Sequence, residues 1–238
     1  MHDSEFHEMS NVEDKHWWFV GRRNIIDFFL KKFIFKKKIE ILEIGCGTGS
    51  NVNLLNKYGN LSVLEPNNTA LGYLKEKKLK IKNLRIGSCP NNLNYDYKFD
   101  LICLFDVLEH IKEDAETIIK ISKILNSQGY VFITVPAYQW LWSDHDVKLM
   151  HKRRYNFHQI KKIIPSNFVI EYKTHFNTLL FPLALIERKL RKIYKINDKN
   201  NNQFLNYIFS KIFYIEKYLL KYISFYFGLS ILIILKKI

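Results

Sequence analysis

The stretch from Ile41 to Ser50, ILEIGCGTGS, constrains the fold more than any other part of the chain. The apolar run from Ile39 to Ile44 is typical of a buried strand, and a run with helical spacing extends from Val52 to Tyr58. Between them stand three glycines at alternate positions, Gly45, Gly47 and Gly49. A strand, a glycine-rich turn and a helix form the first unit of a doubly wound α/β sheet.

The spacing of the glycines indicates which ligand such a turn would hold. Glycine lets a ligand approach the backbone, and the following helix start offers free N–H groups. A dinucleotide fingerprint reads G-x-G-x-x-G, whereas this chain has G-x-G-x-G with Glu43 two residues before the first glycine. ILEIGCGTG resembles motif I of the class I S-adenosylmethionine (SAM)-dependent methyltransferases. The resemblance implies that SAM contacts Glu43, Gly45, Cys46, Gly47 and Gly49. A turn for another nucleotide, or a fortuitous glycine cluster, is the alternative.

A second acidic residue stands where a nucleotide ribose would need it. The strand predicted from Leu61 to Pro66 contains Glu65, twenty residues after Gly45. In doubly wound folds an acid at this separation accepts hydrogen bonds from ribose hydroxyls, and class I methyltransferases use one in the same way. We therefore expect Glu65 and Pro66 to contact SAM.

The stretch from Phe99 to His110, FDLICLFDVLEH, predicts a fourth buried strand that runs into a turn. It resembles the post-strand motif of the same family, which lies along the cofactor near the transferring methyl group. The resemblance implies that Phe105 and Asp106 contact SAM. His110 is a candidate for proton transfer, and a hydrogen-bonding role in the turn is the alternative.

An amphipathic helix is predicted from His16 to Phe33, ahead of the first strand. Its beginning, HWWFVGRR, resembles the N-terminal region of the ubiquinone-biosynthesis O-methyltransferases and of related type 11 and type 12 methyltransferase domains. The resemblance implies that Arg22 or Arg23 pairs with the carboxylate of SAM, which a guanidinium grips with two hydrogen bonds. We expect Trp17 to face the acceptor substrate. Two solvated surface arginines are the alternative.

Residues 137–156, AYQWLWSDHDVKLMHKRRYN, are the least generic part of the chain. They follow the predicted fifth strand, and ligands of open α/β sheets bind at the carboxyl ends of strands. We expect a lid over the acceptor, with His145 as the first candidate for a general base and His110 as the second. The expected acceptor contacts are Trp142, Asp146, His151, Arg153, Arg154 and Tyr155. A rigid cover with internal Asp–Arg pairs is the alternative, and the spacing predicts no metal site.

Helices alternate with strands up to Pro136, which predicts a parallel sheet with right-handed crossovers. A sixth strand is predicted at Phe168–Phe176 and the last one at Phe227–Lys237. The family places its last strand antiparallel between the fifth and sixth. We therefore expect a doubly wound, seven-stranded, mostly parallel α/β sheet of the Rossmann-like methyltransferase type. Its expected parts are an N-terminal helical cap (1–37), the SAM-binding core (38–176), a helical insertion (177–226) and the last strand (227–238).

The insertion and the net charge of +14 predict an anionic partner, and a general over-use of Lys, Asn and Ile along the chain is the alternative explanation of the charge. Apolar residues at Phe181, Leu183 and Ile186 stand beside a basic cluster, and a helix predicted at Phe204–Phe225 follows. The basic residues are Arg188, Lys189, Arg191, Lys192 and Lys195. Such a pattern favours peripheral binding to an anionic membrane, whereas packing on the domain or on a second subunit is the alternative. Charged residues interrupt the apolar runs, so a membrane span is not expected.

Composition and the remaining motifs bound the function. Three scattered cysteines indicate a reducing compartment, and the polar start carries no signal-peptide pattern, so we expect a cytoplasmic protein. The sequence contains no recognised RNA-binding module, so we do not expect a nucleic-acid partner. We expect methyl transfer to an oxygen of a small-molecule, lipid-linked or glycan-related acceptor. VPAYxxLWSxHD with HxRRY also resembles bacterial methyltransferases that accompany glycosyltransferases in surface-polysaccharide pathways. An NAD-dependent oxidoreductase and a non-catalytic SAM-fold adaptor for a membrane or partner are the alternatives.

Overall fold

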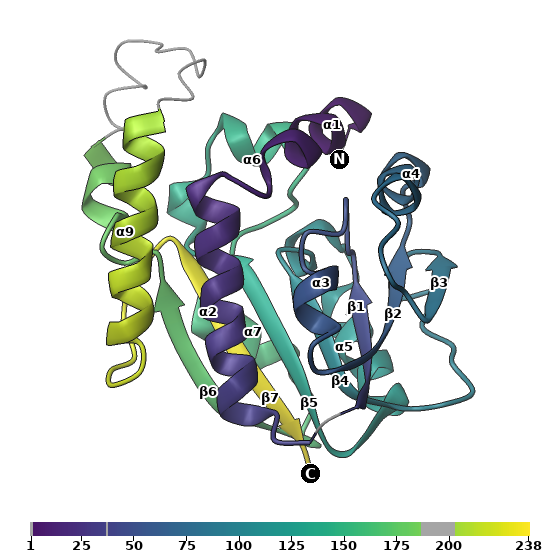
Figure 1. Ribbon diagram of the computed structural model, residues 1–238. Coiled ribbons are helices and arrows are strands. Elements are labelled where there is room, and N and C mark those ends of the chain that lie inside the picture. The colour runs from purple at the N-terminus through teal and green to yellow at the C-terminus, as the bar shows by residue number, and fades with distance from the viewer. Residues whose placement is uncertain (1, 37, 187–202) are drawn as a thin grey trace.

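The computed structural model describes residues 2–36, 38–186 and 203–238, which form a seven-stranded sheet between helices (Figure 1). The strand order is β3-β2-β1-β4-β5-β7-β6, and β7 is antiparallel to both of its neighbours while the other pairs are parallel. This confirms the predicted fold class, including the reversed last strand. The strands are β1 Ile39–Ile44, β2 Gly59–Glu65, β3 Asn83–Ile86, β4 Phe99–Phe105, β5 Leu125–Pro136, β6 Phe168–Phe176 and β7 Ser230–Lys237. The described helices are α1 Asp3–Val12, α2 Trp17–Phe33, α3 Val52–Leu55, α4 Asn68–Glu76, α5 Asp114–Ile124, α6 Asp144–Lys148, α7 Phe157–Ile163 and α9 Gln203–Leu219, with 3-10 turns η1 Leu108–His110 and η2 Gln139–Leu141.

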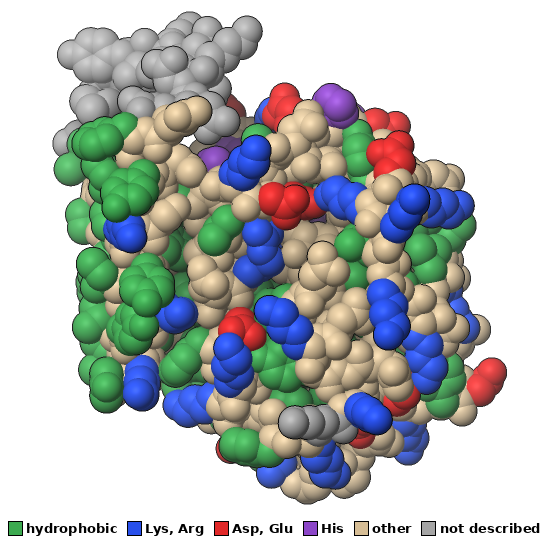
Figure 2. Space-filling model, in the orientation of Figure 1, with side chains coloured by type: hydrophobic (Ala, Val, Ile, Leu, Met, Phe, Trp, Pro, Cys, Tyr) green, Lys and Arg blue, Asp and Glu red, His purple; other side chains and the backbone are tan. Residues whose placement is uncertain are grey.

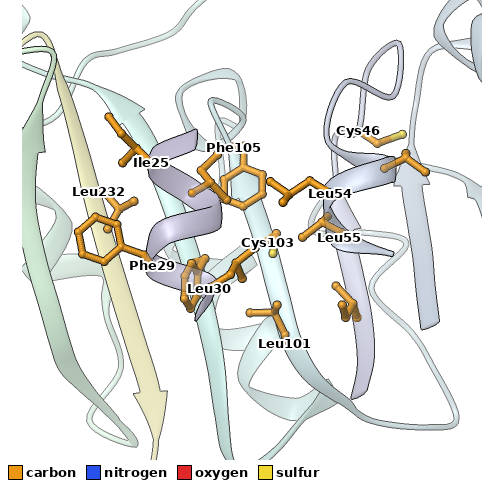
Figure 3. Close-up of a cluster of buried hydrophobic side chains, with 14 of the residues drawn as sticks. Ile25, Phe29, Leu30, Cys46, Leu54, Leu55, Leu101, Cys103, Phe105 and Leu232 are labelled. Carbon is orange, nitrogen blue, oxygen red and sulfur yellow. The ribbon is translucent and has the colours of Figure 1, made fainter. Parts of the chain in front are cut away.

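The central strands are apolar on both faces because helices cover both sides of the sheet. In β4, Leu101 and Cys103 belong to one hydrophobic cluster, whereas Ile102 and Leu104 belong to the other. Successive strand residues point to opposite faces, so a continuous apolar run supplies both clusters. Figure 3 shows the first cluster, in which α2 places Ile25, Phe29 and Leu30 against side chains of α3, β4 and β7.

Helix α2 also packs against α9, a helix that belongs to the predicted insertion. A Cβ atom at Gly21 would lie 2.3 Å from a ring carbon of Phe213, so the absent side chain allows this close packing. Trp17 packs edge-on against Phe209 and Phe213, with ring centroids 5.3 Å apart in each pair. The aromatic residues at the start of α2 therefore join α2 to α9. One face of α9 is buried, and its other face is exposed.

Several predicted boundaries were wrong. The helix predicted to extend to Tyr58 ends at Leu55, because β2 already begins at Gly59. Strand β5 begins at Leu125, directly after α5, with no loop between them. The helix predicted to Phe225 ends at Leu219, and the last strand starts at Ser230 instead of Phe227. The polar start of the chain contains the regular helix α1.

The carboxyl ends of the parallel strands gather the segments that form the site. Figure 1 shows α1 and α6 above these strand ends, whereas the C-terminus lies at the opposite ends of the strands. Helix α1 is fixed there because the buried carboxylate of Glu13 accepts hydrogen bonds from Thr48 Oγ1, at 2.5 Å, and from Lys77. The N-terminal helix is therefore tied to the glycine turn and to α4.

Candidate active site

A large cavity opens at the carboxyl ends of β1, β2, β4 and β5. Its volume is about 1920 Å³. Pockets for one small molecule usually measure about 300–1,000 Å³, so this cavity has room for two reactants. The walls come from the glycine turn, the ends of β2 and β4, the 137–156 segment, helices α1 and α2, and the chain after β6.

The glycine turn forms one wall with bare backbone. Gly45 has a φ of +68° and Gly47 a φ of +55°, which is the left-handed region that side chains disfavour. A Cβ atom at Gly45 would lie 2.6 Å from Val107 Cγ2, and one at Gly47 would lie 3.0 Å from Met9 Cε. Both glycines and Cys46 between them border the cavity. Gly49, which was also predicted to bind the cofactor, does not border it and packs near Leu74 and Leu79.

Of the two acids predicted to contact the cofactor, Glu65 borders the cavity and Glu43 does not. Glu65 borders the cavity, where its Oε2 accepts a hydrogen bond from Gly47 N at 2.9 Å and its Oε1 accepts one from Asn67 N at 3.0 Å. Its carboxylate is thus held at the end of β2, beside Pro66, which also borders the cavity. Glu43 is fully buried below the turn, and its Oε1 accepts a hydrogen bond from Asn51 Nδ2 at 2.8 Å. Burial raises the pKa of Glu43 to about 7.

The structure separates the two arginines that were candidates for the cofactor carboxylate. Arg22 borders the cavity and forms an ion pair with Asp106, whereas Arg23 does not border it. Arg22 is 7 % exposed, and its Nε has no hydrogen-bond partner among the described residues. Asp106 is held by its backbone N–H, which donates to Thr134 O at 2.9 Å. Phe105 and Asp106 both border the cavity at the end of β4.

The 137–156 segment contributes some of its predicted residues to the cavity. Trp142, His145, His151 and Arg154 border it, as do Trp17 of α2 and His110 of η1. Burial lowers the pKa of His110 to about 4, so its imidazole is neutral near pH 7. The candidate bases His145 and His110 therefore share one cavity with the glycine turn.

The other predicted acceptor contacts are engaged inside the protein. Asp146 accepts two hydrogen bonds from Arg154, from Nε at 2.7 Å and from Nη2 at 2.9 Å. Asp114 accepts hydrogen bonds from Arg153 at 2.6 Å and from the Tyr155 hydroxyl at 2.8 Å. Asp146, Arg153 and Tyr155 do not border the cavity. The internal Asp–Arg pairs expected for a rigid cover are thus present, although the same segment also lines the cavity.

Some lining residues were missed by the sequence analysis. Helix α1 contributes Phe6 and Met9, the chain after β6 contributes Leu180, and the turn after β4 contributes Glu109. Burial raises the pKa of Glu109 well above its usual range. Its position beside His110, directly after a buried strand, was the one available sequence signal. The apolar contributions from α1 and the later chain depend on contacts between distant segments, which local patterns do not reveal.

Comparisons with known proteins show which family the chain belongs to. A family model described as a methyltransferase domain matches residues 18–178. An uncharacterized protein of Methanocaldococcus jannaschii is 28% identical over 197 residues, which cover 76% of this chain and 82% of that protein. A ubiquinone biosynthesis O-methyltransferase of Rickettsia bellii is 29% identical over 101 residues, but these cover only 40% of this chain and 41% of that enzyme.

Solved structures share the fold at low sequence identity. The plantazolicin methyltransferase BpumL, in complex with SAH, superposes with a TM-score of 0.63 at 11% identity, covering 98% of this chain and 89% of that one. An S-adenosylmethionine-dependent methyltransferase from Clostridium acetobutylicum gives 0.57 at 16% identity, covering 90% and 91%. These comparisons do not favour the oxidoreductase or the adaptor. Because the family model matches more than half of the chain, the protein belongs to the methyltransferase domain family, as its resemblance to class I SAM-dependent methyltransferases predicted.

Proposed function

We propose that this methyltransferase transfers the methyl group of SAM to an oxygen of an acceptor that binds beneath the 137–156 segment. The observation that carries the proposal is the continuity of the cavity, which borders both the glycine turn and this segment. A donor and an acceptor bound there would share one enclosure. Holding two reactants in line lowers a barrier by up to ~7–11 kcal/mol.

The residues on the glycine side fit SAM. The bare backbone at Gly45 and Gly47 leaves room for the amino-acid part of the cofactor, and Glu65 stands where ribose hydroxyls would donate to a carboxylate. The unpaired Nε of Arg22 supports a contact with the cofactor carboxylate, since a buried guanidinium nitrogen needs an acceptor. Related folds crystallised with SAH support the same cofactor. Bound SAM supplies a sulfonium methyl group that a nucleophile can displace.

The acceptor side of the cavity combines aromatic walls with a few polar groups. Its apolar lining includes Trp17, Trp140, Trp142, Leu180 and Leu183. A bound acceptor would cover these side chains and displace water from them, and a dry site favours transfer because the cationic sulfur becomes neutral. The acceptor would therefore have an apolar or aromatic part beside its reacting hydroxyl, as a small aromatic molecule or a lipid-linked glycan precursor would.

His145 is our proposed general base for the acceptor hydroxyl. It borders the cavity in α6. The depressed pKa of His110 makes that imidazole a weaker base, which favours His145.

The test is a transfer assay with methyl-labelled SAM and separate aqueous and lipid extracts as acceptor sources. His145→Ala should lower turnover about 10²–10⁴-fold while leaving SAH affinity unchanged. His158→Ala is the matched control, because His158 is exposed and does not border the cavity. An equal loss of turnover and SAH affinity in His145→Ala would contradict the assignment.

Peripheral membrane binding is a second proposal, now supported by the outer face of α9. Figure 2 shows hydrophobic side chains gathered along this helix, and Phe204, Tyr207, Tyr214 and Tyr218 are exposed. The five cations on which the sequence argument depended lie in residues 187–202, outside the described residues. Among the described residues, no helix is long and apolar enough to cross a membrane.

Vesicle sedimentation tests the membrane proposal. Replacing Phe204, Tyr207 and Tyr214 together by serine should abolish binding to anionic vesicles, whereas Phe35→Ser, at an exposed position away from α9, should not. High salt should weaken binding by the unchanged chain. A folded protein that ignores anionic vesicles at low salt would end this proposal without affecting the methyltransferase assignment.

A further inference from the structure

Three potential ligands of a metal ion meet on the cavity wall. Glu109 and His110 lie in η1, just after β4, and His151 lies in the 137–156 segment. The nearest carboxylate oxygen and imidazole nitrogens of the three residues all lie within 4.8 Å of one another. All three residues border the cavity. Two segments that are distant in sequence thus bring two imidazoles and a carboxylate together.

The carboxylate of Glu109 lacks a partner. Its side chain is 0 % exposed, and neither of its oxygens has a hydrogen-bond partner among the described residues. His151 Nε2 lies 3.9 Å from Glu109 Oε1, which is too long for a hydrogen bond. Two other carboxylates in this region each have an arginine partner, namely Asp106 with Arg22 and Asp146 with Arg154. Burying an ionised carboxylate without a bound counter-ion is unfavourable, so a cation bound at this point would stabilise the charged form of Glu109.

The two histidines are already oriented. Asp146 Oδ1 lies 2.9 Å from His151 Nδ1, and Asp146 is itself held by two hydrogen bonds from Arg154. An ionised carboxylate accepts, which assigns an imidazole proton to Nδ1 and makes Nε2, 3.9 Å from Glu109 Oε1, the nitrogen available to a metal ion. The His110 ring is held by a hydrogen bond with the backbone of Met150. A carboxylate or carbonyl behind a histidine is how proteins orient metal-binding imidazoles.

We propose that Glu109, His110 and His151 bind one divalent first-row transition-metal ion. Two imidazole nitrogens and one carboxylate oxygen suit Zn²⁺, Mn²⁺, Fe²⁺ or Co²⁺, whereas Mg²⁺ and Ca²⁺ prefer oxygen ligands. Three protein ligands leave coordination positions open, and here the open side is the cavity. Asp146 acts as a positioning residue through His151.

The role of this ion, unlike its binding, rests on the proposed function. An acceptor hydroxyl that ligates the ion becomes more acidic, so its proton passes to His145 or to water. The oxygen then forms a bond to the methyl carbon while the sulfur–carbon bond breaks and its electron pair stays on sulfur. The products are a methyl ether and neutral S-adenosylhomocysteine. The proposal therefore narrows the acceptor class to molecules with a hydroxyl, or two adjacent oxygens, that can ligate a metal.

Metal titration without any cofactor tests the binding. Untagged chain, treated with a chelator and then dialysed, is titrated with Co²⁺ by calorimetry and visible absorption. The unchanged protein should bind one ion per chain. Glu109→Gln keeps the shape of the side chain but removes its charge, and it should weaken binding at least about tenfold, as should His151→Ala. His158→Ala, at an exposed position outside the cavity, should bind like the unchanged protein.

A second readout uses only the unchanged protein, so it does not depend on whether the variants fold. Proton NMR of the Co²⁺ complex should show strongly shifted exchangeable imidazole N–H signals from two histidines. Absence of stoichiometric binding, absence of those signals, or full affinity in folded Glu109→Gln would overturn the site and indicate that Glu109 is a protonated structural acid.

Parallel titration with SAH separates this proposal from the proposed function. Retained SAH binding without Co²⁺ binding would refute the metal site alone. Retained Co²⁺ binding without SAH binding would refute the proposed function alone. If both hold, chelation should abolish transfer while leaving SAH affinity unchanged, and continued transfer in excess chelator would refute the catalytic role.

Discussion

Replacing Gly45 by alanine should disrupt the glycine turn for two reasons that the structure separates. The backbone has a φ of +68° at this position, and an L side chain there costs about 1–2 kcal/mol. The added Cβ would also lie 2.6 and 2.9 Å from the two methyl groups of Val107, a β-branched residue with little rotamer freedom. Overpacking of this kind costs about 1–3 kcal/mol. We therefore expect Gly45→Ala to lower the free energy of unfolding by about 2–5 kcal/mol.

Two further variants test this reasoning. Gly72→Ala is the matched control, because Gly72 lies inside α4 and an added Cβ meets nothing within 4 Å. Alanine should stabilise that helix by up to about 1 kcal/mol. Against a Val107→Ala background, Gly45→Ala should cost only the backbone part, about 1–2 kcal/mol, because the two methyl groups that it would clash with are absent.

Urea denaturation followed by tryptophan fluorescence measures these free energies, and calorimetry with SAH measures the functional effect. Folded Gly45→Ala should bind SAH at least about tenfold more weakly because its Cβ and the shifted turn narrow the cavity. The reasoning is refuted if Gly45→Ala unfolds at the same urea concentration as the unchanged protein and binds SAH equally well.

Three more substitutions test Arg22 on the cavity wall and two buried carboxylates outside the cavity. Arg22→Lys should weaken SAH binding about tenfold, since a bidentate charged hydrogen bond is lost, whereas Arg23→Lys, outside the cavity, should change it less than about twofold; equal effects by calorimetry would contradict the assignment of Arg22. Glu43 has a pKa of about 7 when folded, above its unfolded value, so it favours folding below about pH 4.5 and loses that contribution as pH rises to 7. Urea titrations should therefore show that the free energy of unfolding declines by up to about 3 kcal/mol between pH 5 and pH 8.5. Glu43→Gln should remove this decline. If the variant keeps the pH profile of the unchanged protein, the role of Glu43 is refuted. Glu216→Ala leaves two backbone N–H groups at the start of the chain after β6 without their acceptor and should cost about 2–4 kcal/mol, whereas exposed Lys211→Ala should cost less than about 0.5 kcal/mol; similar urea midpoints for the two variants would show that this contact is dispensable.

The fold was predictable because its signals are local. Continuous apolar runs in β1, β4 and β5 indicate strands buried on both faces, and the positive φ angles at Gly45 and Gly47 explain why the turn needs glycine. Helix α1 was not predictable in this way. Its sequence has little apolar periodicity, and it is fixed by contacts such as that of Glu13 with Thr48, which lies 35 residues away.

Sequence could place a residue of the candidate site where the end of a strand fixes its position. It could not do so where the contacts of a long side chain depend on distant parts of the chain. Glu65 and Asp106 follow directly from the ends of β2 and β4. Adjacent Arg22 and Arg23 point to different sides of one helix, so their spacing in the chain could not decide which of them reaches the cavity. Tyr155 meets Asp114 from 41 residues away, a pairing that no local pattern reveals. The aromatic and charged 137–156 segment therefore indicated a functional region but not which of its side chains face inward.

Calorimetric titration of the purified chain with SAH, and separately with NAD⁺, tests the central claim most directly. The cavity beside Gly45, Gly47 and Glu65 predicts one SAH bound per chain, and Gly45→Ala should weaken that binding. NAD⁺ should give no binding heat at the same concentrations. Saturable NAD⁺ binding together with no binding of SAH or SAM by the folded chain would contradict the account.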